Sequence, residues 1–422
     1  MEYESSLGLV NFSTFTYESG PLEFEDFPIT KGPAYILGQK YNTREERDDL
    51  KHDIKSRLWI TYRRGFPNIG GTGPSSDQGW GCMLRCGQMM LAHTLILRHL
   101  GRGWRWKPYD VQDDKYWKIL KMFEDKKCAI YSIHQIASMG EAEGKAIGQW
   151  FGPNTIAQVL KRISVYDNWS DLAIHVALDN VVILDEIRSL CKTSAKPSTS
   201  QQPSEEGLDL GNNIHFSDFV NADPSHKAGP PKPGPVVAWK PLLLIIPLRL
   251  GLTDINPIYF ESLKKCFTLR QSVGIIGGKP NHAHWFIGYA DDELYYLDPH
   301  TNQNVVDLED RERQAVDVSY HCSTPPSRMI FSKLDPSIAL GFYCKDEEDF
   351  NNWCQVFSSP VQGFRPMFEL RKEAPTAWSY EEVVAPVKKA KKPPQTTPFS
   401  DLFCDEVSST GSNNDEEEFE FL

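Results

Sequence analysis

Three features that would place a chain in a membrane or outside the cell are missing from this sequence. The longest apolar run, Leu242–Leu248, is far too short to cross a bilayer and contains Pro247. The first four residues, Met1 to Glu4, lack the basic start and apolar core of a signal peptide. Nine cysteines scattered over 422 residues do not form the dense, even-numbered pattern of a disulfide framework. We therefore expect a cytoplasmic protein with reduced thiols.

Basic charge is also scarce. The chain has 45 Lys and Arg residues against 57 Asp and Glu residues, which gives a net charge of −12. Phosphate backbones reward clustered Lys and Arg, so this balance argues against a nucleic-acid-binding protein. Much of the acidic excess lies in residues 401–422, which carry eight acidic side chains and no basic one. With 40% hydrophobic and 12% aromatic residues, most of the chain is typical of a globular protein.

Composition divides the chain into regions. Residues 1–30 predict a flexible arm, and residues 31–380 predict one catalytic unit. Lys, Ser, Thr, Gln, Gly and Pro dominate residues 193–238, which predicts a disordered insertion. Residues 381–422 predict a disordered acidic tail. Helical patterns come first and strand patterns follow, so we expect an α+β fold.

Periodicity and turn residues predict the main elements. Asn154 is expected to cap one of the helices. The expected helices lie within 41–59, from Cys82 to Leu100, within 112–137, after Asn154, at 257–269 and at 346–357. The expected strands lie at 181–184, 241–250, 329–331 and 338–343, with a hairpin formed by 284–289 and 294–297.

A glycine-rich loop, Ser75 to Gly81, enters the helix expected to start at Cys82. A thiol at the positive end of a helix dipole favours its thiolate form, which is the nucleophilic form. Cys82 is therefore the candidate nucleophile. Cys86 lies one turn further along the same face. We expect Cys86 to be a small buried hydrophobe, because nothing supplies the other ligands of a metal site.

A nucleophilic cysteine needs a base and a group that orients the base. His300 stands in Leu297-Asp298-Pro299-His300, and residues i and i+2 of an extended segment share a face. Asp-Pro-His alone is common in ordinary turns, but beside an activated cysteine it predicts a catalytic pair. His282 and His284 precede a strand with no carboxylate at metal spacing, so a zinc site is not expected there.

These motifs resemble those of the autophagins, papain-like cysteine proteases that process the ubiquitin-like modifiers of autophagy. The resemblance covers most of residues 25–370, interrupted by 193–238. The segments that carry it are Thr61 to Arg63, Gly70 to Pro74, Asp77 to Gln88, Gly148 to Trp150 and Tyr296 to Thr301. The resemblance implies a papain-like fold, with a mainly helical half that carries the nucleophile, a strand-rich half that carries Asp and His, and a small auxiliary subdomain.

The resemblance also implies roles for single residues. Cys82 corresponds to the nucleophile, His300 to the general base and Asp298 to the acid that orients it. Tyr62 corresponds to a tyrosine that forms the oxyanion hole with the Cys82 backbone N–H, as acyl transfer requires. On its own, Tyr62 would be interpreted as a core tyrosine. No cofactor and no metal is implied.

Two further segments resemble a gate. Trp150 corresponds to a tryptophan that covers the catalytic groove. Gly277, Gly278, Lys279 and Pro280, within 275–281, correspond to a regulatory loop that closes the groove in the free enzyme. Adjacent glycines suit a moving lid, although they equally suit a plain turn. A narrow slot of this kind would admit a glycine, which explains why such enzymes cut after glycine.

The last residues resemble a short aromatic-x-x-aliphatic motif by which autophagy proteins bind the same modifiers. In Glu416 to Leu422 the anchors would be Phe419 and Leu422, with acidic residues before them. A simple solubilising acidic tail is the alternative.

The expected function is that of a cysteine endopeptidase. It would cut modifier precursors of the GABARAP type after a glycine and would release the modifier from phosphatidylethanolamine, touching autophagic membranes transiently through that substrate. The alternative from another class is a non-catalytic adaptor that binds the modifiers. A different ubiquitin-like substrate would share the mechanism.

Overall fold

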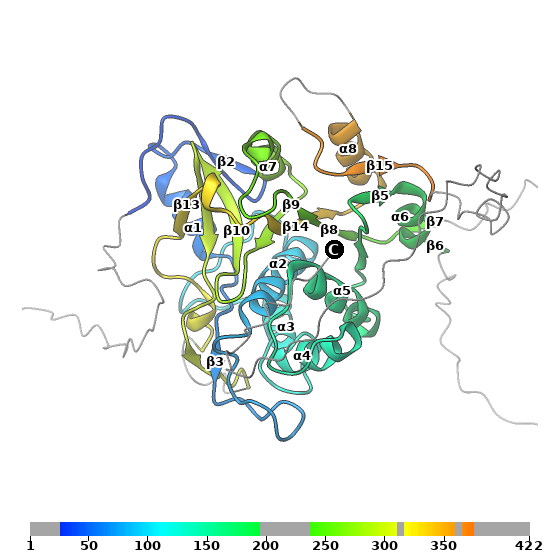
Figure 1. Ribbon diagram of the computed structural model, residues 1–422. Helices are drawn as coiled ribbons and strands as arrows, with labels where there is room; N and C mark the ends of the chain where they lie inside the picture. Colours follow the sequence, from blue (N-terminus) through cyan, green and yellow to red (C-terminus); the bar gives the residue numbers. More distant parts are fainter. Residues whose placement is uncertain (1–25, 195–236, 310–315, 359–364, 375–422) are drawn as a thin grey trace, which may run out of the picture.

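The structure is a computed structural model that describes residues 26–194, 237–309, 316–358 and 365–374 (Figure 1). The helices are α1 Arg47–Lys55, α2 Cys82–His99, α3 Asp114–Met122, α4 Ile133–Gly140, α5 Pro153–Ile163, α6 Leu184–Cys191, α7 Phe260–Thr268 and α8 Glu347–Ser358. The strands are β1 Ala34–Ile36, β2 Gln39–Tyr41, β3 Arg63–Arg64, β4 Ala173–Val176, β5 Val181–Ile183, β6 Lys192–Ser194, β7 Val237–Trp239, β8 Leu242–Arg249, β9 Ser272–Gly277, β10 His284–Ala290, β11 Glu293–Leu297, β12 Gln303–Asn304, β13 Ser327–Ile330, β14 Ser337–Cys344 and β15 Glu369–Arg371.

A nine-stranded mixed sheet organises the described residues. Its main path runs β13-β11-β10-β9-β14-β8-β4, and β1 pairs with both β10 and β2. The pairing is antiparallel except between β4 and β8, which run parallel. The hairpin of β10 and β11 thus lies inside the sheet, where neighbouring strands fix its register.

Both faces of this sheet are covered by helices. Leu243 and Ile245 of β8 point into a core shared with α2, α3, α4 and α5. Leu242, Leu244 and Ile246 of the same strand point into a second core shared with α6, α7 and α8. A strand buried on both faces needs apolar residues at every position, which explains the continuous apolar run of β8. In Figure 1, α3, α4 and α5 lie below the sheet and α8 lies above it.

The expected α+β class is confirmed, and the expected long helix is found as α2. Every residue of α2 from Cys82 to Ile96 is buried. It ends before Gly101, which adopts the left-handed conformation (φ +83°) that glycine tolerates. The predicted hairpin and the strand at 241–250 are also present.

The expectation that Asn154 caps a helix is wrong. The cap of α5 is Gly152, with Pro153 at the first helical position. Proline suits that position because its fixed φ is helical and its missing N–H would be unpaired there in any case. The sequence signal that was overlooked is therefore the Gly-Pro pair itself.

The region boundaries drawn from composition stay predictions. Most of the arm at 1–30 and of the insertion at 193–238, and the entire tail at 381–422 with Phe419 and Leu422, lie outside the described residues. The described residues at the two ends of the expected insertion belong to strands β6 and β7, which pair antiparallel. Among the helices of the described ranges, none has the length and hydrophobicity of a membrane span.

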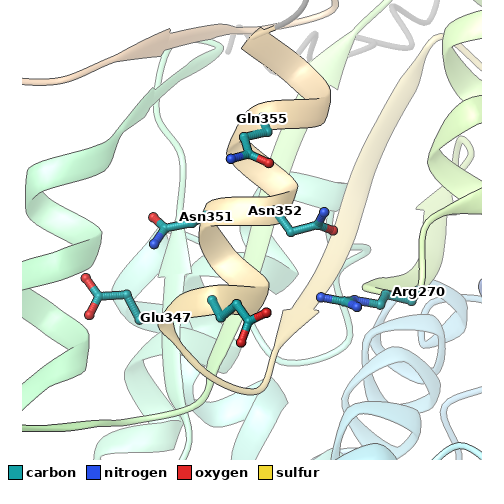
Figure 2. A pocket seen from close by; sticks show the side chains of 6 residues that line it. Arg270, Glu347, Asn351, Asn352 and Gln355 are labelled. Carbon is teal, nitrogen blue, oxygen red and sulfur yellow. The ribbon is translucent and has the colours of Figure 1, made fainter.

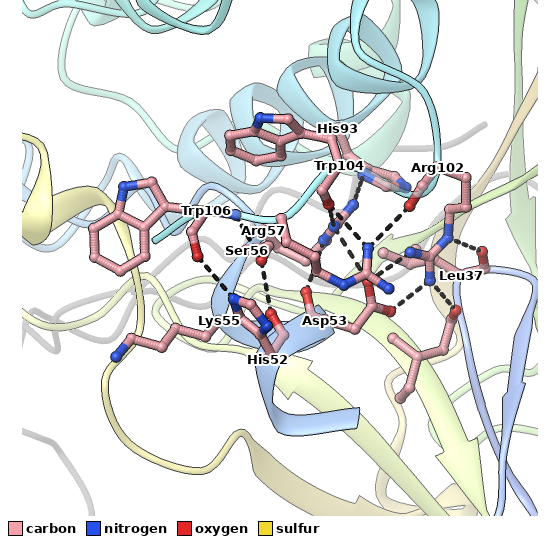
Figure 3. A network of polar contacts seen from close by, with 12 residues as sticks. Leu37, His52, Asp53, Lys55, Ser56, Arg57, His93, Arg102, Trp104 and Trp106 are labelled. Atoms are coloured by element: carbon pink, nitrogen blue, oxygen red, sulfur yellow. Dashed lines mark hydrogen bonds and ion pairs between the residues drawn. The ribbon is translucent and has the colours of Figure 1, made fainter. Parts of the chain in front are cut away.

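A buried ionic network joins α1 to the segment that follows α2 (Figure 3). Asp53 is fully buried and accepts hydrogen bonds from Arg57 at 3.2 Å and from Arg102 at 2.6 Å. Arg105 adds an ion pair at 3.1 Å. Burial alone would raise the pKa of Asp53, but the positive charges around it lower that pKa.

Candidate active site

Cys82 is the first residue of α2 and is fully buried. The residue before it, Gly81, has no room for a side chain, because a Cβ there would lie 2.3 Å from Oδ2 of Asp77. The carboxylate of Asp77 thus occupies the space beside the helix entry. At the first helical turn the backbone N–H groups have no partner within the helix, so the Cys82 N–H is available to a ligand.

A buried network fixes this helix entry. Arg85 donates to both oxygens of Asp77, at 2.8 and 3.1 Å, and to Asp125 at 2.8 Å. The Arg63 backbone N–H also donates to Asp77 at 2.7 Å. Since Arg85 and both carboxylates are buried, charge-assisted hydrogen bonds fix the first turn of α2 against the two segments that carry Asp77 and Asp125.

His300 follows β11, and the expected pairing with Asp298 is present. His300 Nδ1 lies 2.5 Å from Oδ1 of Asp298, and the His300 backbone N–H donates to the same oxygen at 2.9 Å. The indole N–H of Trp59 donates to the Asp298 carbonyl at 2.7 Å. Two hydrogen bonds to one carboxylate oxygen fix the ring, so its Nε2 atom points away from Asp298.

The charges of Cys82 and His300 depend on each other. Burial alone would raise the pKa of the Cys82 thiol, but His300, the Ala283 backbone N–H and the Tyr62 hydroxyl lower it below its ordinary value. Burial alone would lower the pKa of His300, but Asp298 and Cys82 raise it to about 9. The arrangement therefore favours a thiolate beside an imidazolium, which is the reactive state of a catalytic cysteine.

Tyr62 connects the two sides of the site. Its backbone N–H donates to the Pro299 carbonyl at 2.9 Å, and its carbonyl accepts from Gln303 at 3.0 Å. Its ring meets that of His300 edge to face, 5.4 Å between centroids. Burial and the nearby Cys82 thiol raise the pKa of the Tyr62 phenol, so the hydroxyl keeps its proton and can donate it.

Two buried polar atoms lie beside the Cys82 thiol. They are the Tyr62 hydroxyl and Nε2 of His300, and both interact with the Cys82 sulfur. A substrate carbonyl that Cys82 attacks would therefore arrive within reach of both donors. A carbonyl oxygen that becomes negative beside Cys82 fits the Tyr62 hydroxyl, and a leaving amine fits the His300 donor.

The expected loop at 275–281 is partly a strand. Residues 275–277 belong to β9, and Gly277 pairs with His284 on one side and with Ile338 on the other. Gly277 is therefore a strand residue in this structure, and its part in a moving loop stays a prediction. The connection between β9 and β10 begins at Gly278, whose φ of +134° is open to glycine and strained for other residues.

The loop of residues 278–283 includes Lys279 and Pro280 and reaches the nucleophile. The Ala283 backbone N–H lies against the Cys82 thiol, and Ala283 is buried. Trp150 is half-buried and packs against the core that contains Cys82. Its indole N–H is buried and has no hydrogen-bond partner among the described residues. Because Cys82, the Tyr62 hydroxyl and Nε2 of His300 are inaccessible to solvent, the structure shows a closed site.

One residue of the site was missed from the sequence. His284 lies beside the catalytic pair, with its Nε2 atom 4.0 Å from Oδ2 of Asp298. Donor atoms of His284, Asp298 and His300 lie within 4.8 Å of one another, a spacing that a metal ion could use. The short Asp298–His300 hydrogen bond already occupies one donor atom of each, so a metal ion would have to displace its proton.

A polar pocket of about 530 Å³ lies elsewhere, along α8 (Figure 2). Asn351, Asn352 and Gln355 project from this helix, and Arg270 faces them from another segment. The α8 helix covers the face of the sheet opposite to α2. This pocket is therefore separate from the site around Cys82.

The comparisons with known proteins agree with this geometry. A family model described as the peptidase C54 catalytic domain matches residues 47–356. A protein of Gallus gallus named cysteine protease ATG4B is 51% identical over 377 residues, which cover 88% of this chain and 92% of that protein. The proteins named cysteine protease ATG4A of Xenopus laevis and Homo sapiens are 46% and 45% identical, over 96% and 94% of this chain and 97% and 95% of their own lengths.

Proposed function

This chain belongs to the peptidase C54 family and is a cysteine protease of autophagy, and from that premise we propose how its residues act and on what. Cys82 is the nucleophile, His300 the acid and base, Asp298 the group that orients His300, and Tyr62 the side-chain donor of the oxyanion hole. The observation that carries this assignment is the buried Cys82 thiol at a helix entry, beside the Tyr62 hydroxyl and a His300 ring that Asp298 holds. The alternative of a non-catalytic adaptor has no support among the relatives.

The reaction proceeds in two acyl transfers. The Cys82 thiolate attacks the substrate carbonyl, and the negative oxygen is held by the Tyr62 hydroxyl and the Cys82 backbone N–H. His300, protonated at Nε2, gives its proton to the departing amine, and a thioester with Cys82 remains. His300 then takes a proton from water, the hydroxide attacks the thioester, and the acid product leaves with the thiolate restored.

The substrates are ubiquitin-like autophagy modifiers of the GABARAP type. A buried thiol below a closed loop favours a residue without a side chain at the scissile bond, so cleavage follows a glycine. The leaving amine is the next residue in the precursor and phosphatidylethanolamine in the membrane-bound form. One mechanism therefore accounts for both processing and delipidation, and the enzyme meets autophagic membranes only through its substrate, from the cytoplasm.

Substrate entry requires movement of the groove cover. We assign this movement to residues Gly278, Lys279 and Pro280 up to Ala283, together with Trp150. The Gly278 backbone conformation supports a hinge there, whereas Gly277 lies in the sheet between two paired strands.

Phe419 and Leu422 are proposed as the anchors of a modifier-binding motif. Removing residues 415–422 should slow cleavage of the membrane-bound modifier more than cleavage of the soluble precursor, because tethering raises the local concentration of substrate at the membrane. Replacing both anchors by Ala should have the same effect, whereas equal slowing of both reactions would argue against a tether.

The decisive experiment is a panel of ubiquitin-like precursors, each tested with the wild-type chain and with Cys82→Ala. We expect the wild-type protein to cleave autophagy modifiers after glycine and to release the same modifiers from phosphatidylethanolamine vesicles. Cys82→Ala should bind them without cleaving. Cleavage by Cys82→Ala, or cleavage confined to modifiers of other pathways, would overturn the proposal.

A further inference from the structure

The register of the β10–β11 hairpin places His284 opposite Asp298. Trp285 of β10 pairs with Leu297 of β11. The residue before Trp285, which is His284, therefore lies opposite the residue after Leu297, which is Asp298. Directly opposite residues of an antiparallel pair have their Cβ atoms about 5 Å apart. The structure agrees, because Nε2 of His284 lies 4.0 Å from Oδ2 of Asp298, the oxygen that His300 does not use.

His284 flanks the site on that side. Its side chain is 13% exposed, and its ring lies 5.4 Å from the His300 ring and 4.4 Å from the Tyr296 ring, centroid to centroid. The Asp298 side chain is 32% exposed, so His284 covers one side of the carboxylate and leaves the rest open to water. Packed beside Oδ2, the His284 ring limits how far the carboxylate can turn away from His300.

His284 also stands at the base of the loop that covers the groove. It follows Ala283 directly and pairs with Gly277, the last strand residue before that loop. One residue thus contacts the strand that anchors the loop and the acid of the catalytic pair. Any displacement of the loop base is transmitted to Asp298 through this contact.

We propose that His284 is a positioning residue of the active site, which keeps the Asp298 carboxylate directed at His300 and links its geometry to the loop of residues 278–283. The proposal rests on the roles assigned above to Cys82, His300 and Asp298. Neutral His284 suits the task, since a charged ring would compete with His300 for the same carboxylate.

The charged and titratable neighbours of His284 agree with a neutral ring. Burial lowers its pKa to about 4; Asp298 opposes this, whereas His300 and His282 lower the pKa further. The remaining titratable contact, Tyr296, comes from β11. The ring is therefore uncharged at neutral pH, and it reaches Asp298 as a neutral group.

The test uses the full-length protein and needs no modifier. The rate at which iodoacetamide alkylates Cys82, followed by mass spectrometry of the Cys82 peptide across pH, reports the thiolate–imidazolium pair. In His284→Leu we expect the upper transition, near pH 9 in the wild type, to move down by about one pH unit, so that alkylation slows by about twofold at pH 8. His284→Gln, which keeps a donor, should retain most of the wild-type profile.

His175 offers a matched control. It is a buried histidine on β4, at the far end of the same sheet, and burial lowers its pKa to about 4 as well. His175→Leu should leave the alkylation profile unchanged. With substrate, His284→Leu should lower kcat about tenfold with KM within twofold, and His175→Leu should lower neither.

A wild-type profile in His284→Leu, or equal changes in His284→Leu and His175→Leu, would overturn the proposal. His284→Phe serves as a second apolar variant if the leucine variant does not fold. Failure of both to fold while His175→Leu folds would make His284 a structural residue and would equally overturn it. Because alkylation requires no modifier, a wrong substrate assignment would leave this result intact.

Discussion

Asp53, which is fully buried, and Asp298, whose side chain is 32% exposed, both have lowered pKa values, yet their surroundings differ. Asp53 is enclosed by three arginine side chains, which occupy both of its oxygens (Figure 3). Asp298 has a single hydrogen-bonded side-chain partner, His300, which interacts on its other side with the Cys82 thiol. The first cluster contains only charges that stay fixed, whereas the second ends at a nucleophile.

The partner residues explain what each cluster can do. Arginine keeps its proton at every accessible pH, so the Asp53 cluster has one charge state and serves only to hold α1 against the segment after α2. Histidine exchanges its proton near neutral pH, so the Asp298 cluster can transfer one. A cluster of fixed charges therefore indicates a structural role, and a cluster whose histidine can exchange a proton with a cysteine indicates a chemical one.

The largest expected effect is the loss of the His300 ring. His300→Ala removes the group that activates Cys82 and protonates the leaving amine, so kcat should fall by about 10³-fold or more. The measurement is single-turnover cleavage of a modifier precursor at saturating enzyme. If His300→Ala kept a tenth of the wild-type rate, the distinction between the two clusters would fail.

Removing the carboxylate of the Asp53 cluster should lower stability and leave the catalytic chemistry unchanged. Asp53→Ala leaves buried arginines without their counter-charge, which should lower the free energy of unfolding by about 3–5 kcal/mol. Urea unfolding followed by fluorescence measures this change, and kcat of the folded fraction should stay near the wild-type value. Asp26→Ala is the control, since Asp26 forms its ion pairs with Lys51 and Arg47 at the surface and should matter little. Equal losses in both variants would contradict the account.

Tyr62→Phe separates the hydroxyl from the ring. Removing one oxyanion donor should lower kcat by about 10²-fold with KM nearly unchanged. Because this hydroxyl interacts with the Cys82 thiol and, among the described residues, forms no hydrogen bond with a polar group of the core, its loss should change the free energy of unfolding little. A variant that unfolds more easily but cleaves normally would show that Tyr62 is a core residue.

The smallest effect is that of pH on the wild-type protein. The pKa of His300 is raised to about 9, so its protonated form persists through neutral pH and is lost as pH rises through that value. Protonated His300 stabilises the folded protein through Asp298 and Cys82. This contribution to the free energy of unfolding is fully present below the ordinary pKa of histidine and is lost as pH rises through the raised pKa. Cleavage rates under kcat conditions should therefore decline above pH 9, and a plateau that persists to pH 11 would contradict the assignment.

Local patterns sufficed for some parts of the fold and of the site. Amphipathic and apolar periodicity predicted α2 and β8, and the Asp-Pro-His spacing predicted the contact of Asp298 with His300. Strand β9 was missed because serine and glycine fill half of Ser272–Gly277, a composition typical of loops. Its strand character comes from pairing with β10 and β14, which no local pattern reveals.

Long-range contacts were harder to anticipate. His284 meets Asp298 only through the exact register of a hairpin, and a shift of one residue would turn it to the other face. The Asp77–Arg85–Asp125 network joins three segments whose proximity depends on the packing of α2. Such residues become visible once the sheet and its covering helices are assembled.

The most direct test of the central claim is covalent capture of the nucleophile. A modifier that carries a vinyl sulfone in place of its scissile bond should form one adduct per chain, and mass spectrometry should locate it at Cys82. Cys82→Ala should remain unlabelled although exposed Cys128 is still present. Labelling at Cys128, or undiminished labelling of Cys82→Ala, would contradict the account.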